Sequence, residues 1–166
     1  MLLSDYTHQA ARTAIFPPEH GPVYTALGLC SEVAELSTLP GEASKDDVLA
    51  EIGDCLWYVA MVLRTNDLQL HWDLSEQGQL CHPDKIFDGL VGTSGYVAGR
   101  IKKRLRDGHD SVPDEAITDS LDQFLQRLAP LAVVFDSRLD LVAKANLDKL
   151  ASRAARGTLS GSGDHR

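Results

Sequence analysis

The sequence predicts an all-α protein, a helical bundle, and three observations lead to this prediction. Apolar residues recur at spacings of three and four over most of the 166 residues, as one face of a helix requires. The alternation of apolar and polar residues that marks a half-buried strand is nearly absent. Proline and glycine break the periodic segments into lengths typical of helices in globular proteins. Helix packed on helix is therefore the expected architecture.

The periodic segments and their breaks place the expected helices. The first two expected helices cover residues 3–14 and 22–38, and the third is capped by Ser44 or Asp46 and has an apolar stripe that ends at Leu63. A weaker helix is expected over 68–80. The next helix begins at His82-Pro83-Asp84 and stops at Asp107-Gly108, another follows Ser111-Val112-Pro113-Asp114, and the last covers 138–156. Pro17-Pro18 ends the first helix and Pro40-Gly41 ends the second, because proline and glycine disfavour helix continuation. Proline near the start of a later helix is tolerated there.

The second and third helices have the clearest apolar stripes. The stripe of the second consists of Val23, Ala26, Leu27, Cys30, Val33 and Leu36, and that of the third consists of Leu49, Ile52, Leu56, Val59 and Leu63. We expect a single helical domain over residues 1–156. A tail over 157–166, rich in glycine and serine, is expected to have no fixed secondary structure.

Composition and charge narrow the class of protein. With 43% hydrophobic and 24% charged residues, the chain is expected to fold as an ordinary globular domain. The formal charge of −8 argues against a nucleic-acid binder. No apolar run reaches the length of a membrane span, and the start does not resemble a signal peptide, so we expect a cytoplasmic protein, or the host cytoplasm for a phage protein.

The charge is divided unevenly along the chain. Residues 1–80 contain 3 Lys/Arg and 12 Asp/Glu, a net charge of −9, whereas residues 81–166 contain 13 and 12, a net charge of +1. The expected domain therefore has an acidic half over about 1–80 and a basic half over about 85–156. A protein that holds metal with one half and phosphate with the other shows this division, and so does a chain with ordinary charge drift.

Four carboxylates within apolar flanks are the candidate chemical site. Glu32 and Glu35 share one helix face because they are three residues apart, and the same holds for Glu51 and Asp54 on the next helix. Clustered acids repel one another unless a cation lies among them, and oxygen-only ligands suit Mg²⁺ or Mn²⁺. Gly53, in the middle of a helix, suggests close approach of a helix or ligand. A di-iron site is set aside, because no histidine follows an acid at the required spacing.

The second half contains an apparent repeat of the first. Residues 28–36 are similar to residues 89–97. In the second copy Thr93 and Tyr96 stand where Glu32 and Glu35 stood. Ser120 and Gln123 stand near the places of Glu51 and Asp54. If the repeat is real, the second copy has lost its acids, and one metal site per chain is expected.

The paired motifs Glu32-x-x-Glu35 and Glu51-x-x-Asp54 resemble the signature of the MazG-like, all-α nucleoside triphosphate pyrophosphohydrolases. Other segments are similar to family segments as well: 12–17, 26–29, 53–58, 145–153 and 156–166. The resemblance implies Mg²⁺-dependent hydrolysis between the α and β phosphates of a (deoxy)nucleoside triphosphate, which gives the monophosphate and pyrophosphate. It also implies two or more ions per site, with Mn²⁺ able to substitute.

The resemblance also implies roles for particular residues. The metal ligands would be Glu32, Glu35, Glu51 and Asp54, and Glu35 or Glu32 would take the proton from the attacking water. Asn146, Lys149 and Arg153 match the family pattern Asn-x-x-Lys-Leu-x-x-Arg and would contact sugar or phosphate. Trp57, Tyr58, Tyr24 and His20 are candidates for stacking on the base, although aromatic residues in helices more often belong to a core.

One segment departs from the family pattern. Relatives continue the first acidic helix into a basic segment, but here that segment follows the second copy, as Lys102-Lys103-Arg104-Leu105-Arg106-Asp107-Gly108. A tandem arrangement that imitates a dimer is one interpretation, and it makes Lys102, Lys103 and Arg106 candidates for phosphate binding. A solvated basic helix end, favoured by the helix dipole, is the other.

The substrate and the partners stay open at this level. The expectation leans to a purine dNTP such as dGTP, with a dUTP- or dCTP-directed enzyme and a non-catalytic nucleotide-binding bundle as alternatives. The resemblance further implies a homo-oligomer, a dimer or tetramer. A phage or bacterial enzyme of the nucleotide pool fits these expectations.

Overall fold

The computed structural model describes residues 1–78 and 82–160, and this part of the chain is all-helical. Its α-helices are α1 (Leu3–Ala10), α2 (Gly21–Ser37), α3 (Lys45–Thr65), α4 (Pro83–Asp107), α5 (Asp114–Val134) and α6 (Leu139–Arg156). Short 3₁₀ segments cover Ala11–Thr13, Pro18–His20 and His109–Ser111. The predicted all-α class is confirmed, and the helix boundaries lie close to those that the sequence predicts.

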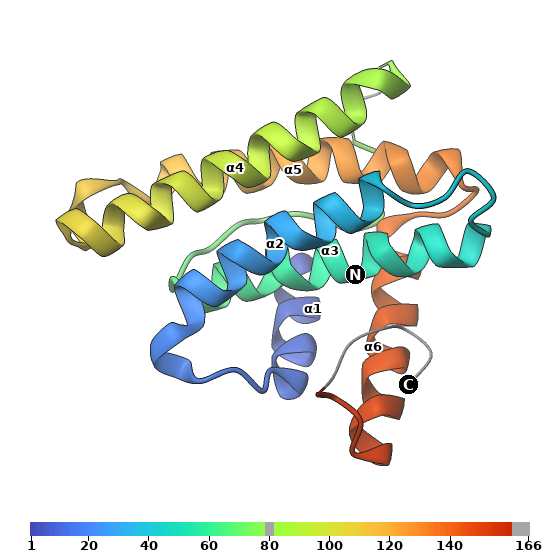
Figure 1. Cartoon of the computed structure of the whole chain (residues 1–166), viewed down its shortest axis with the longest axis horizontal. Coiled ribbons are helices and arrows are strands. Elements are labelled where there is room, and N and C mark those ends of the chain that lie inside the picture. The colour runs from blue at the N-terminus through green and yellow to red at the C-terminus, as the bar shows by residue number, and fades with distance from the viewer. Residues whose placement is uncertain (79–81, 161–166) are drawn as a thin grey trace.

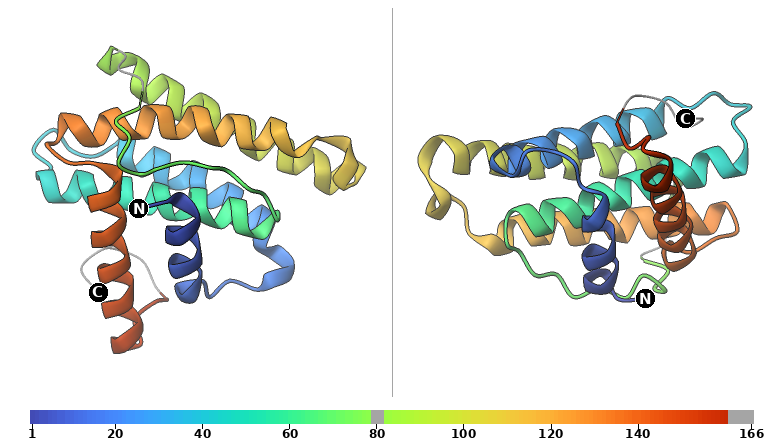
Figure 2. Two further views of the ribbon diagram at one scale, coloured as in Figure 1. Left: turned by 180° about the vertical axis from the view of Figure 1, so that it is seen from behind. Right: turned by 90° about the horizontal axis from the view of Figure 1, so that it is seen from below.

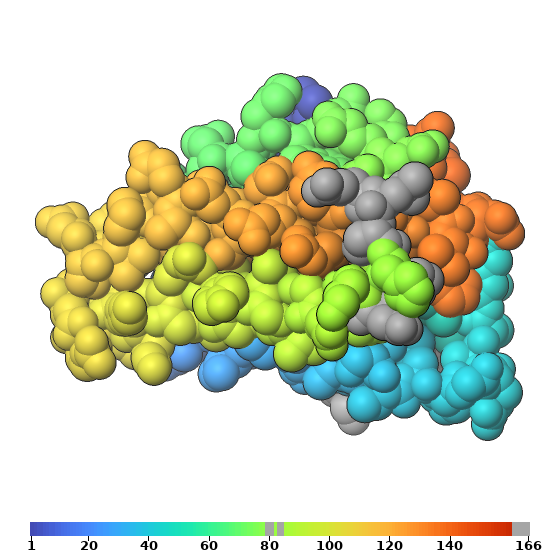
Figure 3. All heavy atoms as spheres, turned by 90° about the horizontal axis from the view of Figure 1, so that it is seen from above, coloured from blue at the N-terminus to red at the C-terminus, as the bar shows by residue number. Residues whose placement is uncertain are grey.

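Four long helices form the bundle in two consecutive hairpins. Helix α2 packs against α3, and α4 packs against α5. Figure 1 shows α2 and α4 in front of α3 and α5, and the second view in Figure 2 shows the same two layers from below. From above, α4 and α5 run next to one another along the length of the molecule (Figure 3). Helices α1 and α6 both pack against α3 and project from the same side of the bundle (Figures 1 and 2).

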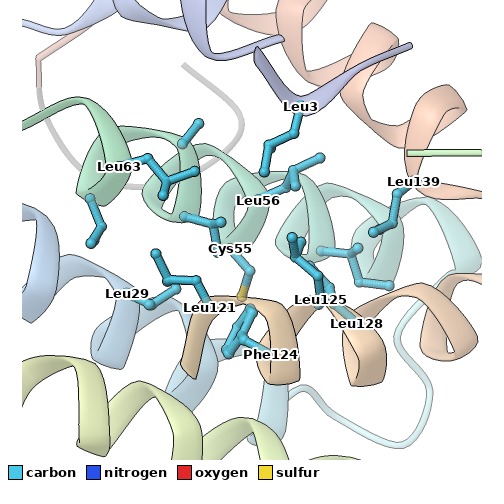
Figure 4. Packing of buried hydrophobic residues seen from close by; sticks show 14 of the residues in the cluster. Leu3, Leu29, Cys55, Leu56, Leu63, Leu121, Phe124, Leu125, Leu128 and Leu139 are labelled. Atoms are coloured by element: carbon cyan, nitrogen blue, oxygen red, sulfur yellow. The ribbon is translucent and has the colours of Figure 1, made fainter. Parts of the chain in front are cut away.

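The core lies between the two layers. Cys55 of α3 is fully buried and points toward Phe124 and Leu121 of α5 (Figure 4). Leu29 of α2 and Leu56 of α3 are buried in the same cluster. Each buried aliphatic side chain contributes about 1.5–3 kcal/mol relative to an exposed one, so this seam fixes how α2 and α3 lie relative to each other.

The start of α3 is fixed by local hydrogen bonds. The Ser44 hydroxyl accepts from the backbone N–H of Asp47 at 3.2 Å, and the Asp47 carboxylate accepts from the backbone N–H of Ser44 at 2.9 Å. This reciprocal pair is a capping box, and it confirms Ser44 as the cap. Helix α3 therefore begins at a defined residue, which sets the direction in which its later carboxylates point.

The weak helix predicted over 68–80 is wrong for the described residues 68–78, which form no helix. Leu68, Trp72 and Leu74 are buried and Leu70 is half-buried, while the residues between them are more exposed, and this alternation of two marks an extended segment. The segment is tied to the N-terminus by bonds from Leu3 N–H to Trp72 O (2.9 Å) and from Leu74 N–H to Met1 O (3.0 Å). Residues 79 and 80 of the predicted helix lie outside the described part of the chain.

None of the helices in the described ranges has the length and apolar character needed to cross a membrane. The predicted tail is described only over 157–160, where α6 ends at Gly157 in the left-handed conformation (φ 69°). That conformation favours glycine and stops the helix. The remainder of the tail, 161–166, lies outside the described residues.

Candidate metal centre

Three of the four predicted metal ligands meet between α2 and α3. One carboxylate oxygen from each of Glu32, Glu35 and Glu51 lies within 4.8 Å of the others. Two oxygens on one Mg²⁺ lie at most about 4.2 Å apart, since each Mg–O distance is about 2.1 Å. Small rotamer changes would therefore let a single divalent cation contact all three residues, and the donor set is the oxygen-only kind that Mg²⁺ and Mn²⁺ prefer.

The charges in this cluster perturb one another strongly. The pKa of Glu32 is raised to about 8, first by burial and then by the negative charges of Asp54, Glu35 and Glu51. Lys149 acts against them by lowering it. The pKa of the buried Cys55 thiol is also raised, first by burial and then by the four acids. A cation among these carboxylates would restore the ionised form of Glu32, because opposite charge favours the charged state.

Asp54 completes the group from a different direction. Its two carboxylate oxygens accept from Lys149 Nζ at 2.9 and 2.7 Å, and Asn146 Nδ2 donates to Oδ1 at 2.9 Å. Both partners come from α6, which packs against α3. Asn146 and Lys149, predicted to contact substrate, therefore lie at the acid cluster, and in this structure they hold Asp54.

The close approach of α6 to α3 depends on Gly53. A Cβ atom built at this position would lie 3.2 Å from both Cβ and Nδ2 of Asn146 and 3.5 Å from Cγ1 of Val142. The predicted close approach at Gly53 is thus confirmed, and the approaching element is a helix. Asn146 lies next to the α3 backbone and within hydrogen-bond reach of Asp54, the residue that follows the glycine.

Tyr6 is a residue of this site that the sequence did not reveal. Its hydroxyl donates to Asn146 Oδ1 at 2.8 Å, although the two residues are 140 positions apart, and its side chain is fully buried. Burial first, and then the charge of Asp54, raise the pKa of the Tyr6 phenol. In the sequence Tyr6 belongs to the apolar stripe of α1 with Leu3 and Ala10, so nothing marks its hydroxyl as part of the site.

Arg153 lies one turn beyond Lys149 on α6 and is buried, with 5% of its surface exposed. Its backbone carbonyl accepts from the N–H of Thr158 at 2.9 Å. Between α3 and α6, a cavity of about 280 Å³ is lined mainly by apolar residues, and Asn146 and Lys149 also line it. The whole Asn-x-x-Lys-x-x-x-Arg face of α6 therefore lies on the side of the helix that meets the bundle.

Trp57 belongs to an aromatic cluster with Phe16, Tyr24 and Tyr58. Its ring meets Tyr58 edge-on at 4.9 Å between centroids and Phe16 at 6.3 Å, and its indole N–H donates to the Ala10 carbonyl at 3.4 Å. Phe16 and Tyr24 stack at 4.9 Å. Tyr24 remains 45% exposed and His20 is exposed at the start of α2. Trp57 and Tyr58 lie one helical turn beyond Asp54 on α3.

The basic segment predicted to bind phosphate is not brought to the acids. Lys102, Lys103 and Arg106 are exposed at the C-terminal end of α4, and Arg106 is paired with Asp107. In Figure 1, this end of α4 and the α2–α3 connection lie at opposite ends of the molecule. The four acids lie on either side of that connection in the sequence. Helices α2 and α4 run in opposite directions along the bundle (Figure 1), and this carries the basic end of α4 away from the carboxylates near the end of α2.

Arg104, in the same basic segment, has a structural role that the sequence did not indicate. It is buried, donates to the carbonyl of Val112 at 3.0 Å through Nε, and pairs with Asp114 at the start of α5. It thus closes the turn of the α4–α5 hairpin. Its burial also fixes the outward direction of the neighbouring cations.

In the second hairpin, the four positions that the apparent repeat aligns with the acids have side chains with hydroxyl groups or an amide. Thr93 is buried and donates to Gly89 O at 2.7 Å, and Ser120 is buried and accepts from Arg100. Tyr96 is 65% exposed with the Arg100 guanidinium 5.5 Å from its ring centroid, and Gln123 is exposed. None of these four residues has a carboxylate, so they add no acid to the site.

Comparison with known proteins gives one relative. The chain is 41% identical to the gene 37 protein of Mycobacterium phage L5 over 81 residues, which cover 47% of this chain and 71% of that protein. No protein-family model matches the chain. No solved structure matches it either. The identity and coverage show that the chain belongs to the family of the gene 37 protein of Mycobacterium phage L5.

Proposed function

We propose that this protein hydrolyses a (deoxy)nucleoside triphosphate to the monophosphate and pyrophosphate, with Mg²⁺ or Mn²⁺. The observation that supports this most is the meeting of Glu32, Glu35 and Glu51 within 4.8 Å, with Asp54 beside them. The four residues form the Glu-x-x-Glu and Glu-x-x-Asp motifs that resemble the MazG-like pyrophosphohydrolases. A phage relative is consistent with a role on nucleotides in the cytoplasm of a bacterial host.

The residues of the site divide the proposed work between α2, α3 and α6. Glu32, Glu35 and Glu51 would hold the metal, with Asp54 as a further ligand, and a bound metal would neutralise phosphate charge and lower the pKa of a water. Glu35 is the most exposed of the three clustered glutamates. It is the group that accepts the proton when the water oxygen attacks the α-phosphorus and the bond to the bridging oxygen breaks, which releases pyrophosphate.

Lys149 is placed to balance phosphate charge. Its ammonium pairs with Asp54 at the edge of the cluster, and it is only partly buried. If a metal ion bound Asp54, the Lys149 ammonium would pair with a phosphate oxygen instead, since the two cations compete for the same carboxylate. Arg153, one turn further along α6, extends the same cationic face.

We propose a purine dNTP such as dGTP as the substrate, with dUTP or dCTP as the alternative. The partly exposed aromatic cluster of Phe16, Tyr24, Trp57 and Tyr58 supports a stacked base near Asp54. We further propose one centre per chain, in an arrangement where the α4–α5 hairpin stands in place of a second subunit, and a homodimer or homotetramer as the assembly.

Pyrophosphate release from a panel of dNTPs, with Mg²⁺ and with EDTA, tests the proposal. We expect Mg²⁺-dependent release from at least one nucleotide. Glu35→Gln should lower kcat by about 10²-fold or more, because it removes the proton acceptor. Glu42→Gln is the matched control, since Glu42 is exposed in the α2–α3 connection and lies outside the cluster.

Two outcomes would contradict the enzyme assignment. Turnover that is unchanged in Glu35→Gln would remove the carboxylate cluster from the reaction. Nucleotide binding without pyrophosphate release from any dNTP would instead favour a non-catalytic nucleotide-binding bundle.

A further inference from the structure

A line of buried hydrogen bonds connects α1 to the acid cluster through α6. Tyr6 Oη donates to Asn146 Oδ1 at 2.8 Å, and Asn146 Nδ2 donates to Asp54 Oδ1 at 2.9 Å. Tyr6 is fully buried and Asn146 is 3% exposed. Within this line each donor and acceptor has its natural partner: a phenol donates to an amide oxygen, and an amide nitrogen donates to a carboxylate.

The orientation of the Asn146 amide is fixed from both ends. The opposite orientation would turn Oδ1 toward the Asp54 carboxylate, where two acceptors would face each other. The α3 backbone limits movement in a third direction, because Asn146 passes so close to Gly53 that even a methyl group there would lie 3.2 Å from its Cβ and Nδ2. Without the Tyr6 hydroxyl, Asn146 Oδ1 would be buried without its donor, which favours rotation of the amide away from Asp54.

Asp54 is thus held in two ways that differ physically. Lys149 contacts both carboxylate oxygens through a charged group that remains partly exposed. Asn146 contacts Oδ1 through a neutral group that is buried and braced by Tyr6. A cation that arrives at the cluster competes with the ammonium of Lys149 but not with the amide of Asn146. The amide contact can therefore persist when the ammonium leaves.

We propose that Tyr6 is a positioning residue of the metal centre: through Asn146 it keeps the Asp54 carboxylate turned toward the cluster when Lys149 exchanges to a phosphate. This gives α1 a role in the site, although none of its residues belongs to the carboxylate cluster. The inference rests on the proposed function only in that Asp54 serves as a metal ligand. Partners that orient a ligating carboxylate typically change metal affinity by 10–100-fold when they are removed.

The test is a double-mutant cycle with Mn²⁺ affinity, measured by calorimetric titration of the full chain without nucleotide, as its readout. The variants are Tyr6→Phe, Asn146→Ala and the two combined. We expect Tyr6→Phe to weaken Mn²⁺ binding about tenfold and to have no further effect in the Asn146→Ala background. Tyr96→Phe is the matched control, since it also removes a phenol hydroxyl, but from an exposed side chain of α4 that lies outside the carboxylate cluster.

The same Mn²⁺ affinity in Tyr6→Phe and in the wild type would overturn the inference. So would a loss of equal size in the two backgrounds, which would indicate a general structural effect. If Tyr6→Phe does not fold, hydrogen exchange of the Asn146 side-chain amide in the wild type decides. We expect it to be slower than that of the half-buried Asn66, and equal or faster exchange would overturn the inference.

The outcome for this inference and for the proposed function can be separated. If the wild type releases no pyrophosphate but its Mn²⁺ binding depends on Tyr6, the positioning role of Tyr6 stands and the proposed reaction is wrong. If the wild type is active but Tyr6→Phe binds Mn²⁺ as tightly as the wild type, the proposed reaction stands and the positioning role of Tyr6 is wrong. A wild type that binds no Mn²⁺ contradicts both.

Discussion

At the scale of single residues, the carboxylate cluster is costly for the fold unless something compensates it. Glu32 lies among three other acids and is partly removed from water, and its pKa is therefore raised to about 8. Only Lys149 among the named contributors acts in the opposite direction. Evolution tolerates such arrangements mainly where a ligand or a reaction uses them. The cluster is accordingly the place where function should be sought first.

The raised pKa of Glu32 predicts how stability changes with pH in the metal-free protein. The folded state binds a proton more tightly than the unfolded state, whose pKa is near 4.5, so the stabilising contribution is complete below about pH 4.5. It is lost as pH rises through about 8. Urea unfolding in EDTA between pH 5 and 8.5 should therefore show stability falling with pH more steeply in the wild type than in Glu32→Gln.

Glu42→Gln serves as the control for this measurement, because Glu42 is exposed and should leave the pH dependence unchanged. Addition of Mg²⁺ should reduce the loss of stability at high pH, because the ion favours the ionised carboxylate. If the wild type and Glu32→Gln have the same pH slope in EDTA, the environment assigned to Glu32 is incorrect.

At the scale of elements, the packing of α2 on α3 decides where the carboxylates meet. The Tyr58 ring of α3 lies directly over Gly28 of α2: a Cβ built on Gly28 would be only 2.0 Å from Tyr58 Cε1 and 2.4 Å from Cζ. The ring cannot easily move, because it also packs against Trp57 and lies 6.3 Å from Tyr24 between ring centroids. Gly28 is four residues before Glu32, so this contact sets the spacing of the two helices beside the metal centre.

This contact predicts that Gly28→Ala destabilises the protein by about 1–3 kcal/mol, the usual effect of overpacking. Gly95→Ala is the matched control. Gly95 lies in the middle of α4 with open space around its added Cβ, so alanine there should stabilise the helix by up to about 1 kcal/mol. Chemical denaturation of both variants checks the prediction. Gly28→Ala at or above wild-type stability would contradict the close contact between Gly28 of α2 and the Tyr58 ring of α3.

Much at this scale was readable from the sequence, and the failures have physical reasons. The apolar stripes predicted the helices and placed Glu32, Glu35, Glu51 and Asp54 on facing sides. The helix predicted over 68–80 failed because the apolar residues Leu68, Leu70, Trp72 and Leu74 are spaced by two rather than by three or four. The role of Tyr6 was not readable, because its partner is 140 residues away and only the packing of α1 and α6 on α3 brings them together.

At the scale of the whole molecule, the two unevenly charged halves of the chain meet at the carboxylate cluster, but of the two expected groups of cations only the one on α6 lies there. The acidic half does supply the carboxylates. The cation that meets them is Lys149 of α6, at the end of the chain, whereas Lys102 and Lys103 lie at the remote end of α4. The sequence could not distinguish these two sources of charge, since the direction of α4 relative to α2 is a property of the hairpin packing.

The two consecutive hairpins pack beside one another, and the three clustered glutamates belong to the first of them. The second pair buries Thr93 and Ser120 and contributes Phe124 and Leu121 to the core around Cys55 (Figure 4). Its contribution to the site is therefore support for α2 and α3. The reacting groups, in this account, come from α2, α3 and α6 alone.

The most direct test of the metal centre is a crystal structure of the protein with Mn²⁺ and a non-hydrolysable dNTP analogue, with the metal located by its anomalous scattering. We predict Mn²⁺ between Glu32, Glu35 and Glu51, with Asp54 still hydrogen-bonded to Asn146 and with Lys149 turned to a phosphate oxygen. Mn²⁺ bound away from these three glutamates, or a triphosphate seated away from α6, would contradict it.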